Sequence, residues 1–197
     1  MSEEKKKATQ KSDQKPKTSI PHSLSFRNLE ADEIEVRVAR CTAKTVELLL
    51  YKDARCDQNI LDETVGPLNW NRSHKEVKSS LYCSIGIYDK DKAEWVYKSD
   101  CGAQSKMEPQ KGEASDSFKR AGFNWGIGRE LYTAPRIKTG IAEIVPKGGN
   151  TFVCYDRFKV EHIKITEDKK ITELIIYNET KQARAFAWSK TKGVIEL

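Results

Sequence analysis

The sequence lacks the short motifs on which most catalysis and metal binding depend. Its 197 residues contain no GxxxxGK[ST], GxSxG or HExxH pattern, and the three histidines, His22, His74 and His162, are widely separated. The five cysteines include no CxxC pair. A P-loop ATPase, a hydrolase of the GxSxG type and a zinc site are therefore not indicated. We predict a protein that is not an enzyme and that uses no cofactor and no metal.

Long apolar runs are also absent. No stretch approaches the length of a membrane span, and the N-terminus has no apolar signal-peptide core. The odd number of cysteines argues against a disulfide framework and for a reducing compartment. We therefore expect a protein of the cytoplasm without a membrane partner.

Positive charge is in modest excess. The net charge of +6 favours a polyanionic partner, but half of it lies in residues 1–20, which are rich in lysine and have no apolar period. We predict that these residues form a disordered tail, which serves solubility or attracts phosphates weakly. A single domain of residues 21–190 and a short tail of 191–197 follow. Because this domain is only mildly basic, a nucleic-acid surface requires clustered cations.

Apolar residues alternate in several short segments, which predicts an α+β fold with mainly antiparallel strands. The most regular unit is a three-stranded meander flanked by two helices, in the order helix-strand-strand-strand-helix. Asp53 is the expected N-cap of the first helix, and Gly66-Pro67 its end. The predicted elements are an N-terminal strand pair at 33–38 and 45–51, a helix at 53–65, meander strands at 70–77, 81–88 and 94–101, a helix at 111–125, a C-terminal hairpin of 152–165 and 171–177 that closes the sheet, and a further edge strand at 183–188.

The helix at 111–125 carries the most informative pattern. Its core-facing stripe, spaced at i, i+4, i+7 and i+11, consists of Ala114, Phe118, Ala121 and Trp125. The rest of its circumference carries Lys111, Lys119 and Arg120. Two interpretations stay open for these cations. They form a rigid platform of fixed positive charge, or they form a solvated face on which Lys119 and Arg120 pair with Asp116.

Other candidate groups give weaker signals. Arg55 lies in the first turn of its helix, where the helix dipole disfavours a cation, and this suggests a function. A metal-dependent nuclease would need Asp100, Glu108 and Lys111 to converge, whereas isolated acids in loops are ordinarily only solvated. Four aromatic residues in strands could stack on bases, although packing is their more common role: Tyr82, Tyr88, Trp95 and Tyr97.

Three segments together carry a family resemblance. They are DARCDQNILDETVGPLNW (53–70), a strand pair leading into EWVYKSDCG (94–102), and GEASDSFKRAGFNWGIGRELY (112–132). In this order and spacing they resemble the Rad-fifty-two family of DNA single-strand annealing proteins, in particular its small bacteriophage and bacterial members. The third segment is the most specific. The resemblance covers residues 34–136 well, the C-terminal hairpin more loosely, and the first 21 residues not at all.

The resemblance implies a ring or helical filament of identical subunits. Its basic groove would hold single-stranded DNA by the backbone, bases outward, so that a complementary strand anneals without ATP during recombination and double-strand break repair. It also implies a phage-encoded protein in the bacterial host cytoplasm, acting with a single-strand binding protein or an exonuclease. An alternative from the element order alone is a double-stranded-RNA-binding module.

Individual positions carry over from the resemblance. Lys119 and Arg120 match the pair that grips the DNA backbone, Lys111 matches another basic position, and Arg55 matches the arginine that opens the first helix. Phe123 departs from distant eukaryotic members, which place a further basic residue there. A second-strand site is expected at Lys90, Lys92 and Lys106.

Overall fold

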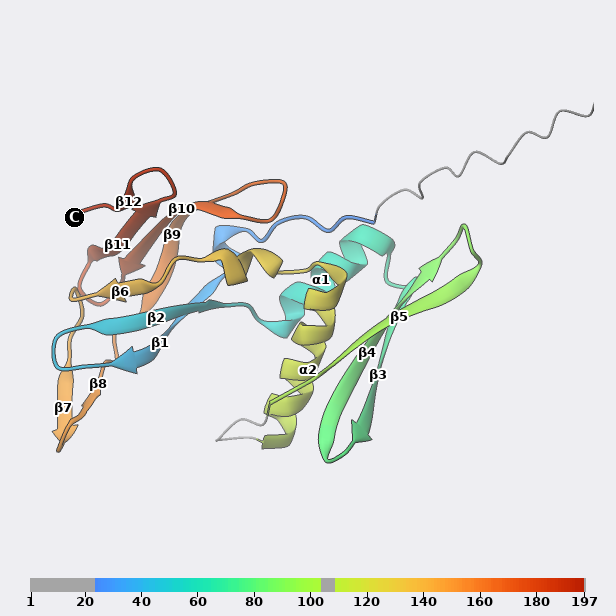
Figure 1. The fold of residues 1–197 in the computed structure, drawn as a ribbon, viewed down its shortest axis with the longest axis horizontal. Coiled ribbons are helices and arrows are strands. Elements are labelled where there is room, and N and C mark those ends of the chain that lie inside the picture. The colour runs from blue at the N-terminus through green and yellow to red at the C-terminus, as the bar shows by residue number, and fades with distance from the viewer. Residues whose placement is uncertain (1–23, 104–108, 197) are drawn as a thin grey trace, which may run out of the picture.

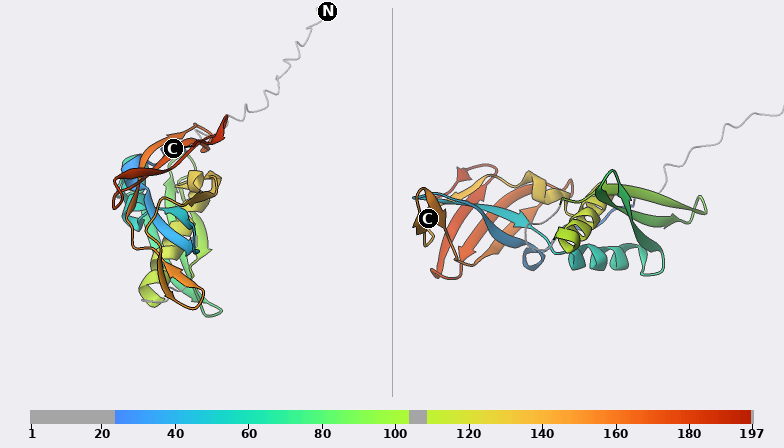
Figure 2. Two further views of the ribbon diagram at one scale, coloured as in Figure 1. Left: turned by 90° about the vertical axis from the view of Figure 1, so that its left-hand side faces the viewer. Right: turned by 90° about the horizontal axis from the view of Figure 1, so that it is seen from below.

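The computed structural model describes residues 24–103 and 109–196. In this part of the chain it contains two α-helices and three antiparallel sheets, so the α+β class predicted from the sequence is confirmed. The large sheet and the three-stranded sheet lie at opposite ends of the molecule, with the two helices beside the three-stranded sheet (Figure 1). The views from the side and from below show the same arrangement (Figure 2).

The predicted helix-strand-strand-strand-helix unit is confirmed. Strands β3 (Trp70–Val77), β4 (Ser80–Asp89) and β5 (Glu94–Cys101) form the meander, which helices α1 (Ala54–Val65) and α2 (Pro109–Trp125) flank. Asp53 caps α1 by accepting a hydrogen bond from the backbone N–H of Arg55 at 2.6 Å. Helix α2 covers the face of the meander on which Cys83 and Ile85 are fully buried. Trp125 fixes its C-terminal end by donating to the Ile85 carbonyl at 3.0 Å.

The N-terminal strands and the C-terminal strands share a second, larger sheet. The strand order is β12-β11-β10-β9-β1-β2-β6. Its members are β1 (Glu35–Cys41), β2 (Val46–Tyr51), β6 (Ile137–Thr139), β9 (Phe158–Ile165), β10 (Ile171–Asn178), β11 (Ala183–Ser189) and β12 (Gly193–Val194). The C-terminal hairpin therefore joins β1 through β9 and does not extend the meander. The alternation within a strand identifies its buried face but not the sheet that receives it.

Three details of the C-terminal half differ from the sequence-based expectation. The segment 152–165 is two strands, β8 (Thr151–Val153) and β9, and β8 pairs with β7 (Val145–Gly148) in a separate hairpin. Strand β6 pairs with β2 and was not predicted. Strand β11 is not at the edge, because β12 pairs with it. Strands of two to four residues contain too few alternations to be recognised from a sequence pattern.

One contiguous hydrophobic core joins both sheets and both helices. The predicted stripe of α2 contributes Phe118 and Ala121, which are 1% and 0% exposed, and the expected inner set of β2 is also buried. Within the described ranges, no helix is long and apolar enough to cross a membrane.

A buried ion pair ties β2, α1 and α2 together. Lys52, just after β2, donates to both carboxylate oxygens of Asp57 in α1, and both side chains are almost completely buried. Two glycines make room for it. A Cβ at Gly122 would lie 2.5 Å from Asp57 Oδ1, and a Cβ at Gly128 would lie 2.2 Å from Lys52 Cε. Gly128 also has a φ of +73°, which other residues rarely adopt.

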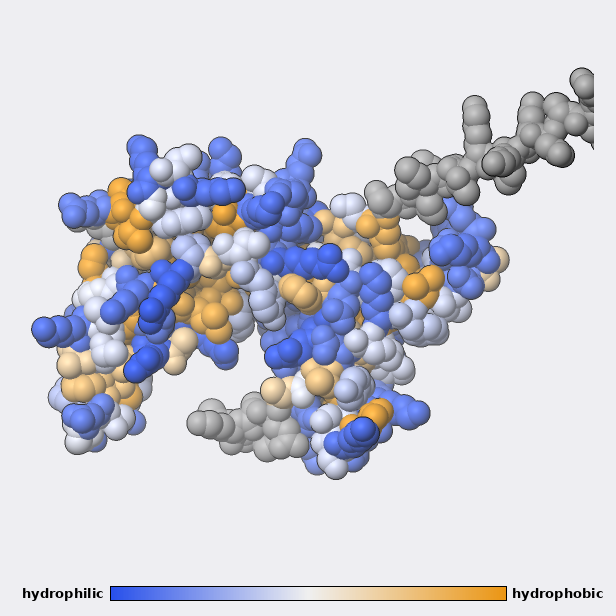
Figure 3. All heavy atoms as spheres, viewed as in Figure 1, coloured by the Kyte–Doolittle hydropathy of each residue, from blue (hydrophilic) through white to orange (hydrophobic). Residues whose placement is uncertain are grey.

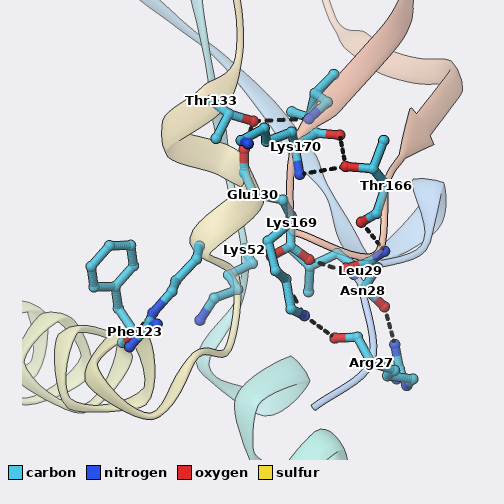
Figure 4. Close-up of polar contacts among 12 residues, drawn as sticks. Arg27, Asn28, Leu29, Lys52, Phe123, Glu130, Thr133, Thr166, Lys169 and Lys170 are labelled. Carbon is cyan, nitrogen blue, oxygen red and sulfur yellow. Dashed lines mark hydrogen bonds and ion pairs between the residues drawn. The ribbon is translucent and has the colours of Figure 1, made fainter. Parts of the chain in front are cut away.

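The 3-10 helix η2 (Arg129–Thr133) connects α2 to the large sheet. Its Glu130 is fully buried and accepts a hydrogen bond from the Leu29 backbone N–H at 2.7 Å, and Lys169 Nζ lies 3.8 Å from its other oxygen. Lys169 also donates to the Arg27 carbonyl at 2.6 Å. These contacts join η2, the segment before η1 (Ala31–Glu33) and the turn between β9 and β10 (Figure 4).

We predict that Lys52→Met destabilises the protein by about 3–5 kcal/mol at pH 7, because Asp57 would lose its partner and would have to keep an uncompensated buried charge or take up a proton. Urea unfolding followed by circular dichroism measures this effect. Lys138→Met, on an exposed position of β6, is the matched control and should change the free energy of unfolding by less than about 0.5 kcal/mol. Equal effects of the two variants would contradict a structural role for the ion pair.

Candidate nucleic-acid interface

A groove of about 760 Å³ lies between β2 on one side and α2 with η2 on the other. Its volume is within the range of about 300–1,000 Å³ that is usual for ligand sites. In the space-filling view, the surface is hollowed between the large sheet and the half of the molecule that contains α2 (Figure 3). The groove thus forms where the two halves of the fold meet.

Positive charge predominates along the groove. Among the described residues that line it, five are cationic and two are acidic: Arg37, Lys52, Lys119, Arg120, Arg136, Glu47 and Asp116. Lys52 is neutralised by Asp57, so the cations available to a ligand come from β1, α2 and the segment before β6. Their convergence supplies the clustering that the modest net charge of the domain requires.

Lys119 and Arg120 both line this groove, so the structure brings the two leading candidates together. Arg120 Nε donates to Asp116 Oδ2 at 2.9 Å, one helical turn away, as one sequence-based interpretation anticipated. Its side chain is still 46% exposed. Lys119 makes no hydrogen bond or ion pair with any described residue, and its positive charge favours the ionised forms of Asp53 and Asp57. Only Arg120 is therefore paired.

Two further arginines line the groove, and the sequence analysis missed both as site residues. Arg136 donates a hydrogen bond to Glu47, a residue of β2, and the Arg37 guanidinium lies 5.5 Å from the centre of the Tyr51 ring. Arg37 gave one usable signal, because alternation in β1 places it opposite the apolar set. Arg136 gave none, since it precedes a strand that was not predicted.

Arg55 and Lys111 do not line the groove. Arg55 forms an exposed ion pair with Asp53 at 2.7 Å, and this hydrogen bond is the main reason why the pKa of Asp53 lies below its usual value. Lys111 is exposed on α2, two turns before Lys119, a separation of about 12 Å along the helix axis. Arg55 is connected to the groove indirectly, because its partner Asp53 feels the charge of Lys119, which lines the groove. Lys111 lies further along α2.

The expected second-strand site is not assembled within the described residues. Lys90 and Lys92 lie in the turn between β4 and β5, at the end of the meander farthest from the large sheet (Figure 1). Lys92 lies 3.3 Å from Asp89 in an ion pair. Lys106 is outside the described residues. Lys90 and Lys92 are therefore on the opposite side of the helices from the groove.

The aromatic residues of the meander contact one another, away from the groove. Tyr88 and Trp95 have ring centres 5.5 Å apart, Trp95 and Tyr97 are 6.4 Å apart, and the Tyr97 ring lies over Gly86. Trp95 and Tyr97 are 39% and 53% exposed, so these rings contact one another at the surface and do not enter the core. Tyr82 is half-buried at the other end of β4.

A different aromatic pair lies in the groove. Phe123 of α2 and Tyr132 of η2 have ring centres 4.6 Å apart, and Tyr132 is 74% exposed. Phe123 had been noted only as a departure from the family pattern. The close-up shows its ring beside the turn that leads into η2 (Figure 4).

The acids considered for a nuclease have other contacts or are not described. Asp100 accepts hydrogen bonds from the Cys101 backbone N–H at 2.8 Å and from Asn124 at 3.3 Å. Glu108 is outside the described residues. Within those residues, no group of three or more His, Cys, Asp or Glu side chains is placed to hold a metal ion.

No family model, no curated protein and no solved structure matches the chain. The resemblance to the Rad-fifty-two family therefore stays a prediction.

Asp53 and Asp57, at the start of α1, have opposite electrostatic environments. Burial raises the pKa of Asp57 to about 6, and the attraction of Lys52 offsets only part of that effect. The hydrogen bond from Arg55 instead lowers the pKa of the more exposed Asp53. Because folded Asp57 holds its proton more tightly than the unfolded chain does, its contribution to the free energy of unfolding falls as pH rises from about 4 to about 6.

We predict that carbon-13 NMR of the side-chain carboxyls detects this difference. The Asp57 signal should titrate with a midpoint near pH 6, and the Asp53 signal should titrate below the ordinary pKa of an aspartate. Asp57→Asn identifies the first signal by removing it. A midpoint for Asp57 below that of Asp53 would show that the ion pair outweighs burial.

Proposed function

We propose that this protein binds single-stranded DNA along the groove between β2 and α2 and anneals it to a complementary strand without ATP, in recombination and double-strand break repair. The observation that carries the proposal is the convergence of Arg37, Lys119, Arg120 and Arg136 on one groove. The family resemblance adds the expectation of a phage-encoded protein, acting in its bacterial host with a single-strand binding protein or an exonuclease.

The groove suits a ligand that is held by its phosphates. Arg120 and Arg136 pair with carboxylates at the surface, where both partners keep part of their solvent exposure, and such pairs contribute little to stability. A phosphate can therefore replace the carboxylate at small cost. Arginine also binds phosphate with two parallel hydrogen bonds. Binding through phosphates is independent of base sequence. A protein that anneals arbitrary strands requires this independence.

Self-association into a ring or helical filament is part of the proposal. In the described part of the chain, β3 and β5 are the edges of the three-stranded sheet, and β6 and β12 are the edges of the large sheet. Unpaired strand edges can accept a strand from another subunit. A series of subunits would join their grooves into one track, so that each subunit needs to contribute only a few phosphate contacts.

The double-stranded-RNA alternative is supported by the order α1-β3-β4-β5-α2. However, one wall of the groove comes from β2 and another part from the segment before β6, and neither belongs to that module. A protein that bound its ligand only through the double-stranded-RNA-binding module would not use the groove. We therefore favour single-stranded DNA as the ligand.

We predict that replacing Lys119 and Arg120 together with alanine weakens binding of an oligothymidylate by about tenfold or more, because charge-assisted contacts are lost. The plot of log affinity against log salt concentration should become shallower by about 0.7 for each lost phosphate contact. Fluorescence anisotropy measures both quantities.

The control replaces Lys190 and Lys192 with alanine. This variant has the same change in charge at exposed positions of the large sheet, between β11 and β12. It should bind like the wild type. Equal losses in the two double variants would show that net charge, and not the groove, governs binding.

A second prediction separates the two candidate ligands. Unlabelled single-stranded DNA should displace a labelled oligonucleotide at lower concentration than duplex RNA of the same length, because the groove holds a single backbone. The protein should also accelerate the pairing of complementary oligonucleotides without ATP. Preferential displacement by duplex RNA would favour the alternative.

A further inference from the structure

The aromatic pair in the groove is poorly explained by folding alone. Tyr132 is 74% exposed, so its ring gains little from the hydrophobic core. It nevertheless has a fixed position, because buried Glu130 holds η2 to the segment before η1, and because the Tyr132 ring lies against Phe123. A flat, exposed ring is thus presented to the groove from a rigid support.

Arg129 supports the pair from the helix side. Its guanidinium lies 5.6 Å from the centre of the Phe123 ring, and its side chain donates to the carbonyls of Phe123 at 2.8 Å and Asn124 at 2.9 Å. These contacts fix Phe123 behind Tyr132. The hydroxyl of Tyr132 lies close enough to Arg120 to contribute to the raised pKa of that guanidinium, after the larger effect of Asp116. Arg120, which we propose binds phosphate, and the exposed ring of Tyr132 line the same groove.

We propose that Tyr132, backed by Phe123, stacks against one unpaired base of the strand whose phosphates contact Lys119 and Arg120. This inference rests on the proposed function and adds the feature that selects single strands. Phosphate contacts alone also attract a duplex, whereas a base in a duplex has both faces covered by its neighbours. Stacking on aromatic side chains is tolerant of sequence, because every base has a π face.

The wall formed by β1 and β2 offers a second flat surface. The Arg37 guanidinium lies over the Tyr51 ring, and a hydrogen bond with Glu35 is the main reason why the pKa of Tyr51 rises to about 12. Tyr51 is therefore already in contact with Arg37 and Glu35 of the neighbouring strand β1. Tyr132, whose ring is far more exposed, is the one positioned to receive a base.

The test compares two oligonucleotides of equal length, an oligothymidylate and an abasic strand with the same phosphates. Tyr132→Ala should weaken binding of oligothymidylate by about 5- to 150-fold and leave binding of the abasic strand unchanged. The salt dependence should stay as in the wild type, since no phosphate contact is removed. Tyr132→Trp should retain the preference for the strand with bases.

Tyr155→Ala is the matched control. Tyr155 is also an exposed tyrosine, 70% accessible, with a lysine, Lys147, 5.9 Å from its ring centre, but it does not line the groove. This variant should bind both strands like the wild type.

An unchanged ratio of the two affinities in Tyr132→Ala would overturn the stacking proposal. If sedimentation velocity also shows that this variant has lost self-association, Tyr132 is a contact between subunits. Failure of the wild type to bind either strand would instead refute the proposed function itself.

Discussion

The buried ion pair between Lys52 and Asp57 is the constraint on which the arrangement of the groove depends. It joins the end of β2 to α1, directly beneath α2, and both of its charges are removed from water. Such a pair tolerates little displacement, because a shift of either partner leaves an uncompensated charge in the core. Gly122 and Gly128 allow α2 and the following turn to approach it closely. The buried ion pair and the close approach at the two glycines therefore together determine the spacing between β2 and α2, and hence the width of the groove.

η2 extends this constraint to the aromatic part of the site. One side of this short helix carries Glu130, which is buried against the segment before η1 and the turn between β9 and β10, and the other side carries the exposed Tyr132. Residues from both ends of the chain thus hold a single turn at the edge of the groove. Short 3-10 helices have little stability of their own, so the position of Tyr132 depends on these tertiary contacts.

The groove combines three kinds of contact that differ in what they recognise. Arg120 and Arg136 pair with partly exposed carboxylates that a phosphate replaces in the proposed complex, Lys119 is unpaired among the described residues, and Tyr132 offers an exposed ring. Charge supplies attraction that is independent of sequence and sensitive to salt. An aromatic ring adds selection for an unpaired base. Together these contacts support the proposed function, in which the protein holds one strand and then releases it to pair with its complement.

The sequence by itself determined the local elements: the strands of the meander, the cap of α1 at Asp53 and the buried stripe of α2 around Phe118. Each follows from a period or a capping residue that neighbouring residues enforce. It also indicated that Lys119 and Arg120 share a helix with a buried opposite side. Only the tertiary structure decided that the C-terminal strands join β1, that Arg37 and Arg136 reach the same groove, and that Lys90 and Lys92 do not. These relations depend on pairing between residues far apart in the chain, and alternation within a strand is the same whichever partner it meets.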